Sequence, residues 1–597
     1  MKTQVTEDHA QPGISGLPSL VLSRSRDVCK EILARTSGLT GWCWVLTMAV
    51  ALIYTASFAS FISRHTSLPF WDGFVYVEKT WNLADNFYRA SFAQRLNPAL
   101  YLNDIQPERP PLLIATAAIV LGPNPGNAAI ARVWLGLRVV VVLLALYLLS
   151  RRFGTAAFAP AAALVIFGSP LMSNFYRLYF MDEPFAAFGL LAFALLLVDD
   201  QRQTIWSALA AAAGILMLFL VKPVAPAFVL PLCVVRGARA FLSFRQQRSD
   251  LRSLMLWALP YSILLVIMLL LLYATPYGPG IREQYKLGQT GFWQRHVGFA
   301  EAVQLTFLMV PPWLLLALII VAGLSQGPQH RSVLLYVAAG FLWWVLFSFA
   351  LTYTVEDRLL GQAMPYLVTG ILISVCYRPR AVLITTLAAA FFFTYNMLAV
   401  NGRTKQRSKT SQRVRLFSPV PQRQQPVPEV GLIQFAPQLE AAVHAQKKQK
   451  IWGIFGDVYV EPNALNMALR MTSQAGSVFV ASLPRTPRDL NLARFCNTRW
   501  FITKMRRPND GSIGTGLWTV VNCMHWAITD PDSPMHTYFQ KIGEGPIHQP
   551  DLEDTLVLWH LPSVPPAPVI AATLRWLKPR LTNEPPAFSA AIEEQLR

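Results

Sequence analysis

The stretch LMLWALPYSILLVIMLLLL, residues 254–272, runs for nineteen positions without a charged side chain. A helix of about 20 apolar residues is long enough to cross the hydrocarbon core of a bilayer, which is about 30 Å thick. Residues 133–149, VWLGLRVVVVLLALYLL, form a second block of this kind with a single arginine. Such blocks predict helices that span a membrane.

The composition of the whole chain agrees with this prediction. Of its 597 residues, 53% are hydrophobic and only 14% are charged, and the mean hydropathy is +0.36. A soluble globular protein of this size needs more polar surface. The apolar blocks lie between residues 42 and 400, whereas the last third of the chain has an ordinary soluble composition.

The apolar blocks and the charges beside them predict a mostly α, polytopic membrane protein with about eleven spans. The predicted spans are Trp42–Phe61, Val133–Leu149, Thr155–Ser169, Pro184–Val198, Thr204–Val221, Val224–Val235, Leu254–Leu272, Val303–Leu324, Val333–Leu351, Leu359–Cys376 and Ala381–Val400.

The formal net charge of +19 comes mainly from Lys and Arg in short loops between apolar blocks and in one linker. This is the positive-inside pattern of membrane proteins. No zinc-finger spacing or RNA-binding motif accompanies the charge, so nucleic-acid binding is excluded as the main reading. Residues 1–41 are polar and basic, which predicts a cytoplasmic N-terminal segment and an uncleaved first helix.

The predicted first outer loop, residues 62–131, is far longer than a connection between spans requires. Long loops of this kind usually carry function. Within it, Leu112–Leu121 is apolar but too short to span, so an interfacial helix is expected after the Pro110-Pro111 break.

The chain continues with a basic, Pro-rich linker, residues 401–428, and a small soluble α/β domain, residues 429–597. No phosphate-binding loop or nucleophile elbow occurs in this domain, which favours a binding or scaffolding role. The predicted strands are Ile451–Phe455, Val478–Ala481, Trp500–Thr503, Trp518–Val521 and Thr555–Trp559, with a helix at Ala464–Arg470. Cys496 and Cys523 are either a disulfide or two free thiols.

Several charged motifs fall on the same, outer side of this predicted topology. Asp72 follows the first span in LPFWDGFVY, and Tyr76 and Glu78 come just after it. The remaining motifs are Arg109-Pro110-Pro111-Leu112, the segment Arg177–Glu183 that enters the fourth helix, Lys222-Pro223, and Glu356-Asp357-Arg358 followed by Pro365. Alone, Asp182 reads as a helix-start acid and Lys222 as a helix-end lysine.

In their order and common side, these motifs over residues 42–376 resemble the GT-C superfamily of membrane glycosyltransferases. The branches that they resemble are the lipid A aminoarabinose transferases, the Rgt-type enzymes and the protein O-mannosyltransferases. Many relatives carry Asp-Glu in the first loop, whereas Gly73 follows Asp72 here. Because of this difference, the resemblance does not decide whether the protein uses a metal ion.

The resemblance implies roles for individual residues. Asp72 would be the catalytic base, and Asp182 would orient the acceptor or support the base. Arg109, Lys222 and Arg358 would hold the donor phosphate. The candidates for binding substrate beside them are Tyr76, Arg177 and Glu183.

The predicted function is therefore transfer of a sugar from a polyisoprenyl-phosphate donor to a lipid, glycan or protein acceptor of the cell envelope. The expected location is the inner membrane, with the site facing the periplasm. No tightly bound ion is expected, although a loosely held divalent cation could bridge the phosphate. Two other readings remain open: a transporter or flippase of lipid-linked saccharides, and a noncatalytic membrane scaffold.

Overall fold

The computed structural model describes the greater part of the chain. The described ranges are 40–60, 72–97, 111–123, 125–169, 182–246, 251–275, 332–343, 362–376, 378–400, 431–443, 449–455, 462–472, 478–482, 490–505, 519–549, 552–581 and 586–597, with a few isolated positions between them.

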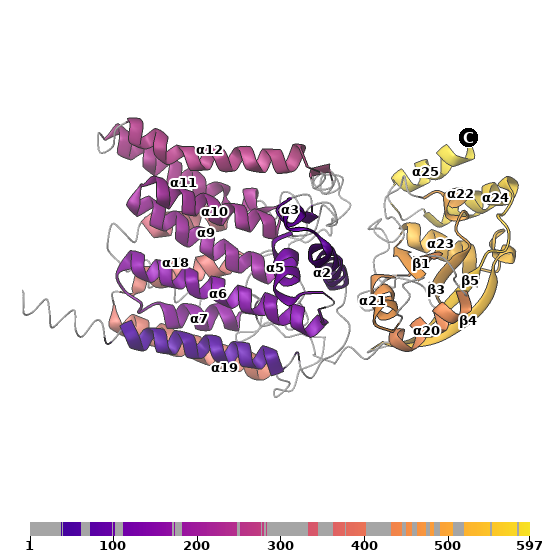
Figure 1. The fold of residues 1–597 in the computed structure, drawn as a ribbon, viewed down its shortest axis with the longest axis horizontal. Coiled ribbons are helices and arrows are strands. Elements are labelled where there is room, and N and C mark those ends of the chain that lie inside the picture. Colours follow the sequence, from indigo (N-terminus) through magenta and orange to yellow (C-terminus); the bar gives the residue numbers. More distant parts are fainter. Residues whose placement is uncertain are drawn as a thin grey trace, which may run out of the picture.

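A bundle of apolar helices makes up the N-terminal two thirds of the structure (Figure 1). Its helices are Thr40–Ser60, α6 (Asn127–Phe153), α7 (Ala159–Gly168), α9 (Asp182–Arg202), α10 (Ile205–Val221), α11 (Ala225–Arg245), α12 (Leu251–Tyr273), Ser332–Trp343, α18 (Met364–Val375) and α19 (Pro379–Val400). In the described ranges, four of them are long and apolar enough to cross a membrane: Thr40–Ser60, α6, α11 and α12.

The helices agree in position with ten of the predicted spans, and the eleventh, Val303–Leu324, lies outside the described residues. The count of eleven crossings therefore stays a prediction. The block predicted at Val224–Val235 is longer than expected, because α11 continues to Arg245. The C-terminal turns of α11 contain arginines, so a search for apolar residues alone ends the helix too early.

The long loop after the first span is largely helical. It contains α2 (Asp72–Arg89), α3 (Phe92–Arg95) and α5 (Pro111–Leu121), of which only α5 was expected. These helices lie at one end of the bundle, next to the C-terminal sheet (Figure 1). The indole Nε1 of Trp81 on α2 donates to the carbonyl of Pro125 at 2.6 Å, which ties α2 to the turn before α6.

Helix α9 is the centre of the bundle, and its apolar side chains are almost all buried. A helix that is hydrophobic all round is typical of such a central position. Helices α10 and α11 can approach α9 closely because glycines lie at the contacts. A Cβ at Gly189 of α9 would stand 2.8 Å from the Phe228 ring of α11, and a Cβ at Gly214 of α10 would stand 2.6 Å from Leu195 of α9.

The C-terminal part is a five-stranded sheet of order β2-β1-β3-β5-β4 with helices around it (Figure 1). Strands β2, β1 and β3 are parallel, whereas β5 runs antiparallel to β3 and forms a hairpin with β4. The elements are α20 (Leu432–Val443), β1 (Gln449–Ile454), α21 (Pro462–Thr472), β2 (Val478–Ser482), α22 (Leu492–Phe495), β3 (Trp500–Lys504), α23 (Thr519–Thr529), β4 (Gln540–Gln549), β5 (Leu552–His560), α24 (Ala567–Leu577) and α25 (Pro586–Leu596).

Four of the five predicted strands are confirmed, as is the predicted helix between the first two. The strand predicted at Trp518–Val521 is wrong, because residues 519–521 form the start of α23. Strand β4 was not predicted. The two cysteines of this part, Cys496 and Cys523, are buried free thiols rather than a disulfide.

Candidate functional site

The two ends of the bundle can be told apart by their contacts. The α2 end is the end where α2 and α5 lie and where α6 begins. At the opposite end, which we call the far end, Arg152 near the end of α6 donates from Nε to the carbonyl of Leu197 on α9 at 3.2 Å. Helices α6 and α9 therefore run in the same direction, and Asp182, the first residue of α9, lies at the α2 end.

Asp182 is the centre of a polar cluster at this end. Its side chain is buried, and Oδ1 accepts from Lys222 Nζ at 2.7 Å and from Gln362 Nε2 at 2.5 Å. The carboxylate also stands at the N-terminus of α9, where the helix dipole favours negative charge. The structure thus brings two of the predicted site residues, Asp182 and Lys222, into direct contact.

Lys222 reaches Asp182 because of where its helix stops. It is the C-cap residue of α10, and Pro223 follows it, so the chain turns there before α11 begins. The ammonium lies 5.8 Å from the centre of the Phe185 ring on α9, and the Lys222 side chain is 28% exposed. Because an ammonium has three N–H donors, Lys222 can bind an anion while it remains paired with Asp182.

Gln362 is the part of this cluster that sequence reasoning missed. It lies just before α18, is fully buried, and its Oε1 has no hydrogen-bond partner within the described part of the chain. A buried amide oxygen without a donor is costly, so this atom is suited to accept a hydroxyl or amine hydrogen from a ligand. A lone Gln before a Met-Pro pair gives no sequence signal of this role.

Glu183 and Arg138 are charged residues buried in the same half of the bundle. Glu183 follows Asp182 and is completely buried, and Arg138 of α6 is 2% exposed. The Arg138 guanidinium lies 4.5 Å from the Phe58 ring centre and 5.7 Å from that of Tyr54. The charges of Arg138 and Glu183 both lie close enough to Tyr54 to act on its hydroxyl.

Tyr76 of α2 lies at this end but within the packing of helices. It is 7% exposed, and its ring meets Trp134 of α6 edge-on, with 6.4 Å between the ring centres. Trp134 donates in turn to the carbonyl of Leu113 on α5 at 2.9 Å. Tyr76 therefore joins α2 to the bundle, and its predicted contact with substrate stays a prediction.

The remaining predicted site residues are not placed by the structure. Arg109, Arg177 and Arg358 lie outside the described residues, as does the side chain of Asp72, although α2 begins at this residue. Their roles stay predictions. Among the described residues, no three His, Cys, Asp or Glu side chains are grouped so that they could hold a metal ion.

Comparison with known proteins gives matches only among solved structures. The sequence matches no protein-family profile and no curated protein. Two solved structures of ArnT from Cupriavidus metallidurans, one in the apo state and one bound to undecaprenyl phosphate, each have a TM-score of 0.49. Their sequence identities are 16% and 14%, and each alignment covers 87% of this chain and 98% of the other.

A third solved structure is the arabinofuranosyltransferase AftD from Mycobacteria. Its TM-score is 0.45 at 14% identity, and the alignment covers 88% of this chain but 40% of AftD.

Proposed function

We propose that the protein is a membrane glycosyltransferase that takes a sugar from a polyisoprenyl-phosphate donor and passes it to a cell-envelope acceptor at the outer face of the membrane. The observation that carries this proposal is the cluster of the buried Asp182 and Gln362 with the partly exposed Lys222 at the α2 end of an apolar bundle. Ionisable groups within a membrane bundle are costly to bury, so their presence marks a functional site by default.

The chemistry of the cluster suits the leaving group. When the bond from the anomeric carbon to the phosphate breaks, negative charge grows on the polyprenyl phosphate, and a nearby cation stabilises it. Lys222 supplies that cation. Asp182 keeps the ammonium in place by accepting its hydrogen at 2.7 Å, so the cation is oriented before the reaction begins.

Asp72 is the proposed base. The acceptor hydroxyl or amine must lose a proton as it attacks, and a carboxylate can accept that proton. Asp72 is the first residue of α2, where the helix dipole favours the ionised form that a base needs. A single displacement would invert the anomeric centre. The acceptor would approach from the outer aqueous side, and Asp182 or Gln362 would orient it.

The test is transfer of labelled sugar by the protein in lipid nanodiscs. Polyprenyl-phosphate donors extracted from membranes serve as the donor panel, with undecaprenyl phosphate as the first carrier lipid, and cell-envelope fractions serve as acceptors. We expect the native protein to transfer sugar. Asp72→Asn and Lys222→Gln should lower the rate by about 100-fold or more, the size of effect seen when one charge-stabilising group is removed.

A matched control is Lys79→Gln, which removes a partly exposed lysine of α2 outside the cluster. It should leave the rate within about twofold of native. Undiminished transfer by Asp72→Asn would reject its role as the base. If the native protein moves the labelled donor across the bilayer without transferring sugar, the transporter is correct instead. If it does neither across the whole panel, the noncatalytic scaffold is correct.

A further inference from the structure

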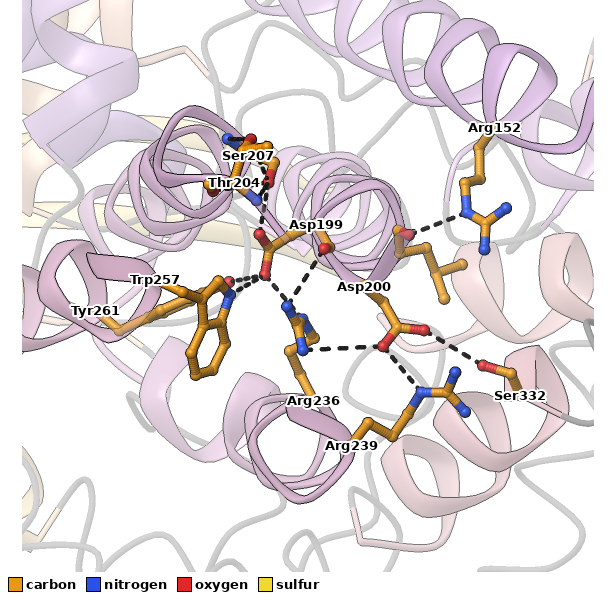
Figure 2. Close-up of polar contacts among 11 residues, drawn as sticks. Arg152, Asp199, Asp200, Thr204, Ser207, Arg236, Arg239, Trp257, Tyr261 and Ser332 are labelled. Carbon is orange, nitrogen blue, oxygen red and sulfur yellow. Dashed lines mark hydrogen bonds and ion pairs between the residues drawn. The ribbon is translucent and has the colours of Figure 1, made fainter. Parts of the chain in front are cut away.

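The far end of the bundle holds a second buried acid pair, Asp199 and Asp200, near the C-terminus of α9 (Figure 2). Asp199 is completely buried, and all its contacts are short. Its Oδ2 accepts from Arg236 Nε at 2.8 Å, Trp257 Nε1 at 2.7 Å and the Tyr261 hydroxyl at 2.9 Å, and its Oδ1 accepts from the Ser207 hydroxyl at 2.7 Å.

Asp200 extends the network to other helices. Its Oδ1 accepts from Arg239 Nε at 2.8 Å and lies 3.9 Å from Arg236 Nη1, and its Oδ2 is 3.5 Å from the Ser332 hydroxyl. The two carboxylates balance the two guanidinium groups. Because both oxygens of Asp199 already have donors, this network is built to join helices and offers Asp199 to no ligand.

The helices that the network joins are those that carry the cluster at the α2 end. Ser207 belongs to the first turn of α10, and its hydroxyl binds Asp199 of α9. Lys222 ends the same helix and binds Asp182, which begins α9. Helices α9 and α10 are thus fastened to each other at both ends. Asp182 and Asp199 are separated by about 26 Å of helix, at about 1.5 Å per residue.

Two polar contacts, one at each end of the α9–α10 pair, can fix the register of the two helices. If α10 slid along α9 by one residue, a shift of about 1.5 Å, the 2.7 Å contact between Lys222 and Asp182 would lengthen unless the lysine side chain followed. The Lys222 side chain is long and 28% exposed, so that contact alone does not set the register. The Ser207–Asp199 contact, which is short and buried, can set it.

We propose that Asp199 is a positioning residue that holds α10 in register with α9 and so places Lys222 beside Asp182. Its four donors come from three helices, and Arg236 adds a bond to the Asp199 carbonyl at 3.3 Å and lies 4.4 Å from the Trp257 ring centre. The effect on sugar transfer rests on the proposed function. The effect on the placement of Lys222 does not.

The direct test is the reactivity of Lys222 towards an amine-acylating reagent, measured by mass spectrometry on the whole protein in nanodiscs with no donor or acceptor. Acylation requires that Nζ meets the reagent, and the 2.7 Å contact with the Asp182 carboxylate holds the Lys222 Nζ in place, so Lys222 reacts slowly in the native protein. Asp199→Asn should raise the acylation rate of Lys222 severalfold relative to Lys79 of α2, the internal reference. Asp182→Asn removes the partner of Lys222 directly and shows how large the increase can be.

Two further variants separate register from loss of fold. Asp200→Asn is the matched control, because Asp200 contacts α11 and Ser332 and, in the described part of the chain, makes no hydrogen bond to α10, so Lys222 acylation should not change. Ser207→Ala removes the α10 donor to Asp199 and leaves Arg236, Trp257 and Tyr261 in place, so Lys222 acylation should rise in a folded protein.

Unchanged acylation of Lys222 in both Asp199→Asn and Ser207→Ala, with native elution and thermal unfolding, would overturn the proposal. Raised acylation together with no transfer by the native protein would support the positioning role and reject the proposed function alone. Raised acylation with undiminished transfer in Asp199→Asn would reject the link between register and catalysis.

Discussion

Arg138 places a full positive charge among the apolar side chains of α6. Two aromatic rings, those of Phe58 and Tyr54, cover the guanidinium, and a cation over an aromatic face gains about 0.5–2 kcal/mol. Its Nε and Nη2 make no hydrogen bond within the described part of the chain.

Replacement of Arg138 should therefore destabilise the bundle. Arg138→Gln removes the cation that lies over the Phe58 and Tyr54 rings, and we expect the free energy of unfolding in mixed micelles to fall by about 2 kcal/mol. Arg132→Gln, at an exposed position of the same helix, should change it by about 0.5 kcal/mol or less. Equal effects of the two variants, followed by tryptophan fluorescence, would contradict this account.

The candidate site was predictable in part from single residues. Asp182 and Lys222 stand at helix ends beside prolines, which is visible in the sequence, but that they contact each other depends on the packing of α9 against α10. Gln362 and Arg138 gave no signal, since each is a single polar residue inside a predicted apolar span. Asp199 lies just beyond the predicted span Pro184–Val198, and the sequence analysis gave it no role.

The buried thiols of the C-terminal part should be unreactive in the native protein. Burial raises the pKa of Cys496 to about 12 and also raises the pKa of Cys523, so neither forms the nucleophilic thiolate near neutral pH. At pH 8, a maleimide should modify both residues only after unfolding, as seen by mass spectrometry. Modification of both at equal rates in the native and unfolded chains would contradict their burial.

The raised pKa of these thiols makes the stability of the folded state depend on pH in a definite direction. Above about pH 9, the ordinary value for a thiol, the unfolded chain loses these protons while the folded chain keeps them. The folded state then binds more protons, so its stability falls as pH rises. Cys496→Ser should weaken this alkaline loss of stability, measured as Tm against pH.

At the scale of whole elements, α9 depends on small residues to pack between α10 and α11. The Phe228 ring fills the space where a Cβ of Gly189 would lie, and Phe228 also meets Phe185 edge-on at 5.0 Å between ring centres. Small residues at such contacts let the backbones of membrane helices approach closely. The effect of a substitution at Gly189 is therefore decided by packing against Phe228 rather than by helix propensity.

A pair of glycine variants tests this point. Gly189→Ala should lower Tm, because its Cβ would stand 2.8 Å from Phe228 Cε1 and force α9 and α11 apart. Gly136→Ala on α6 adds the same methyl group where no heavy atom lies within 4 Å. Since alanine favours a helix over glycine by about 1 kcal/mol, its Tm should stay the same or rise. A fall of equal size in both variants would contradict the packing account.

Helices and strands were predictable where local propensity and the spacing of apolar residues agreed, and not where the two disagreed. Trp518–Val521 is rich in β-branched and aromatic residues and favours a strand, yet Val520, Met524, Ala527 and Ile528 recur at helical spacing and are buried in α23. Strand β4 was missed because its sequence, QKIGEGPIHQ, contains two glycines and a proline. Tertiary pairing with β5 supplies what local propensity lacks.

At the scale of the molecule, helix α9 connects two polar layers that differ in composition. The layer at the α2 end contains the partly exposed Lys222 and the amide oxygen of Gln362, which accepts no hydrogen bond from any described residue, so this layer suits a ligand. The layer at the far end is charge-balanced, which suits a fixed support. This division agrees with a site at one face of the membrane only, next to α2 and to the C-terminal sheet (Figure 1).

The arrangement predicts which parts of the chain meet the two aqueous compartments. Arg245 ends α11 at the far end, whereas Lys541 lies on β4 beyond the α2 end, and both are exposed. If the far end is cytoplasmic, as its arginines indicate, the two residues lie on opposite sides of the membrane. In intact cells, a membrane-impermeant thiol reagent should label Lys541→Cys at once and Arg245→Cys only after permeabilisation. The native protein, whose described cysteines are at least partly buried, gives the background. Labelling of both variants from outside would place both ends in the same compartment and would require an even number of crossings between α11 and the sheet.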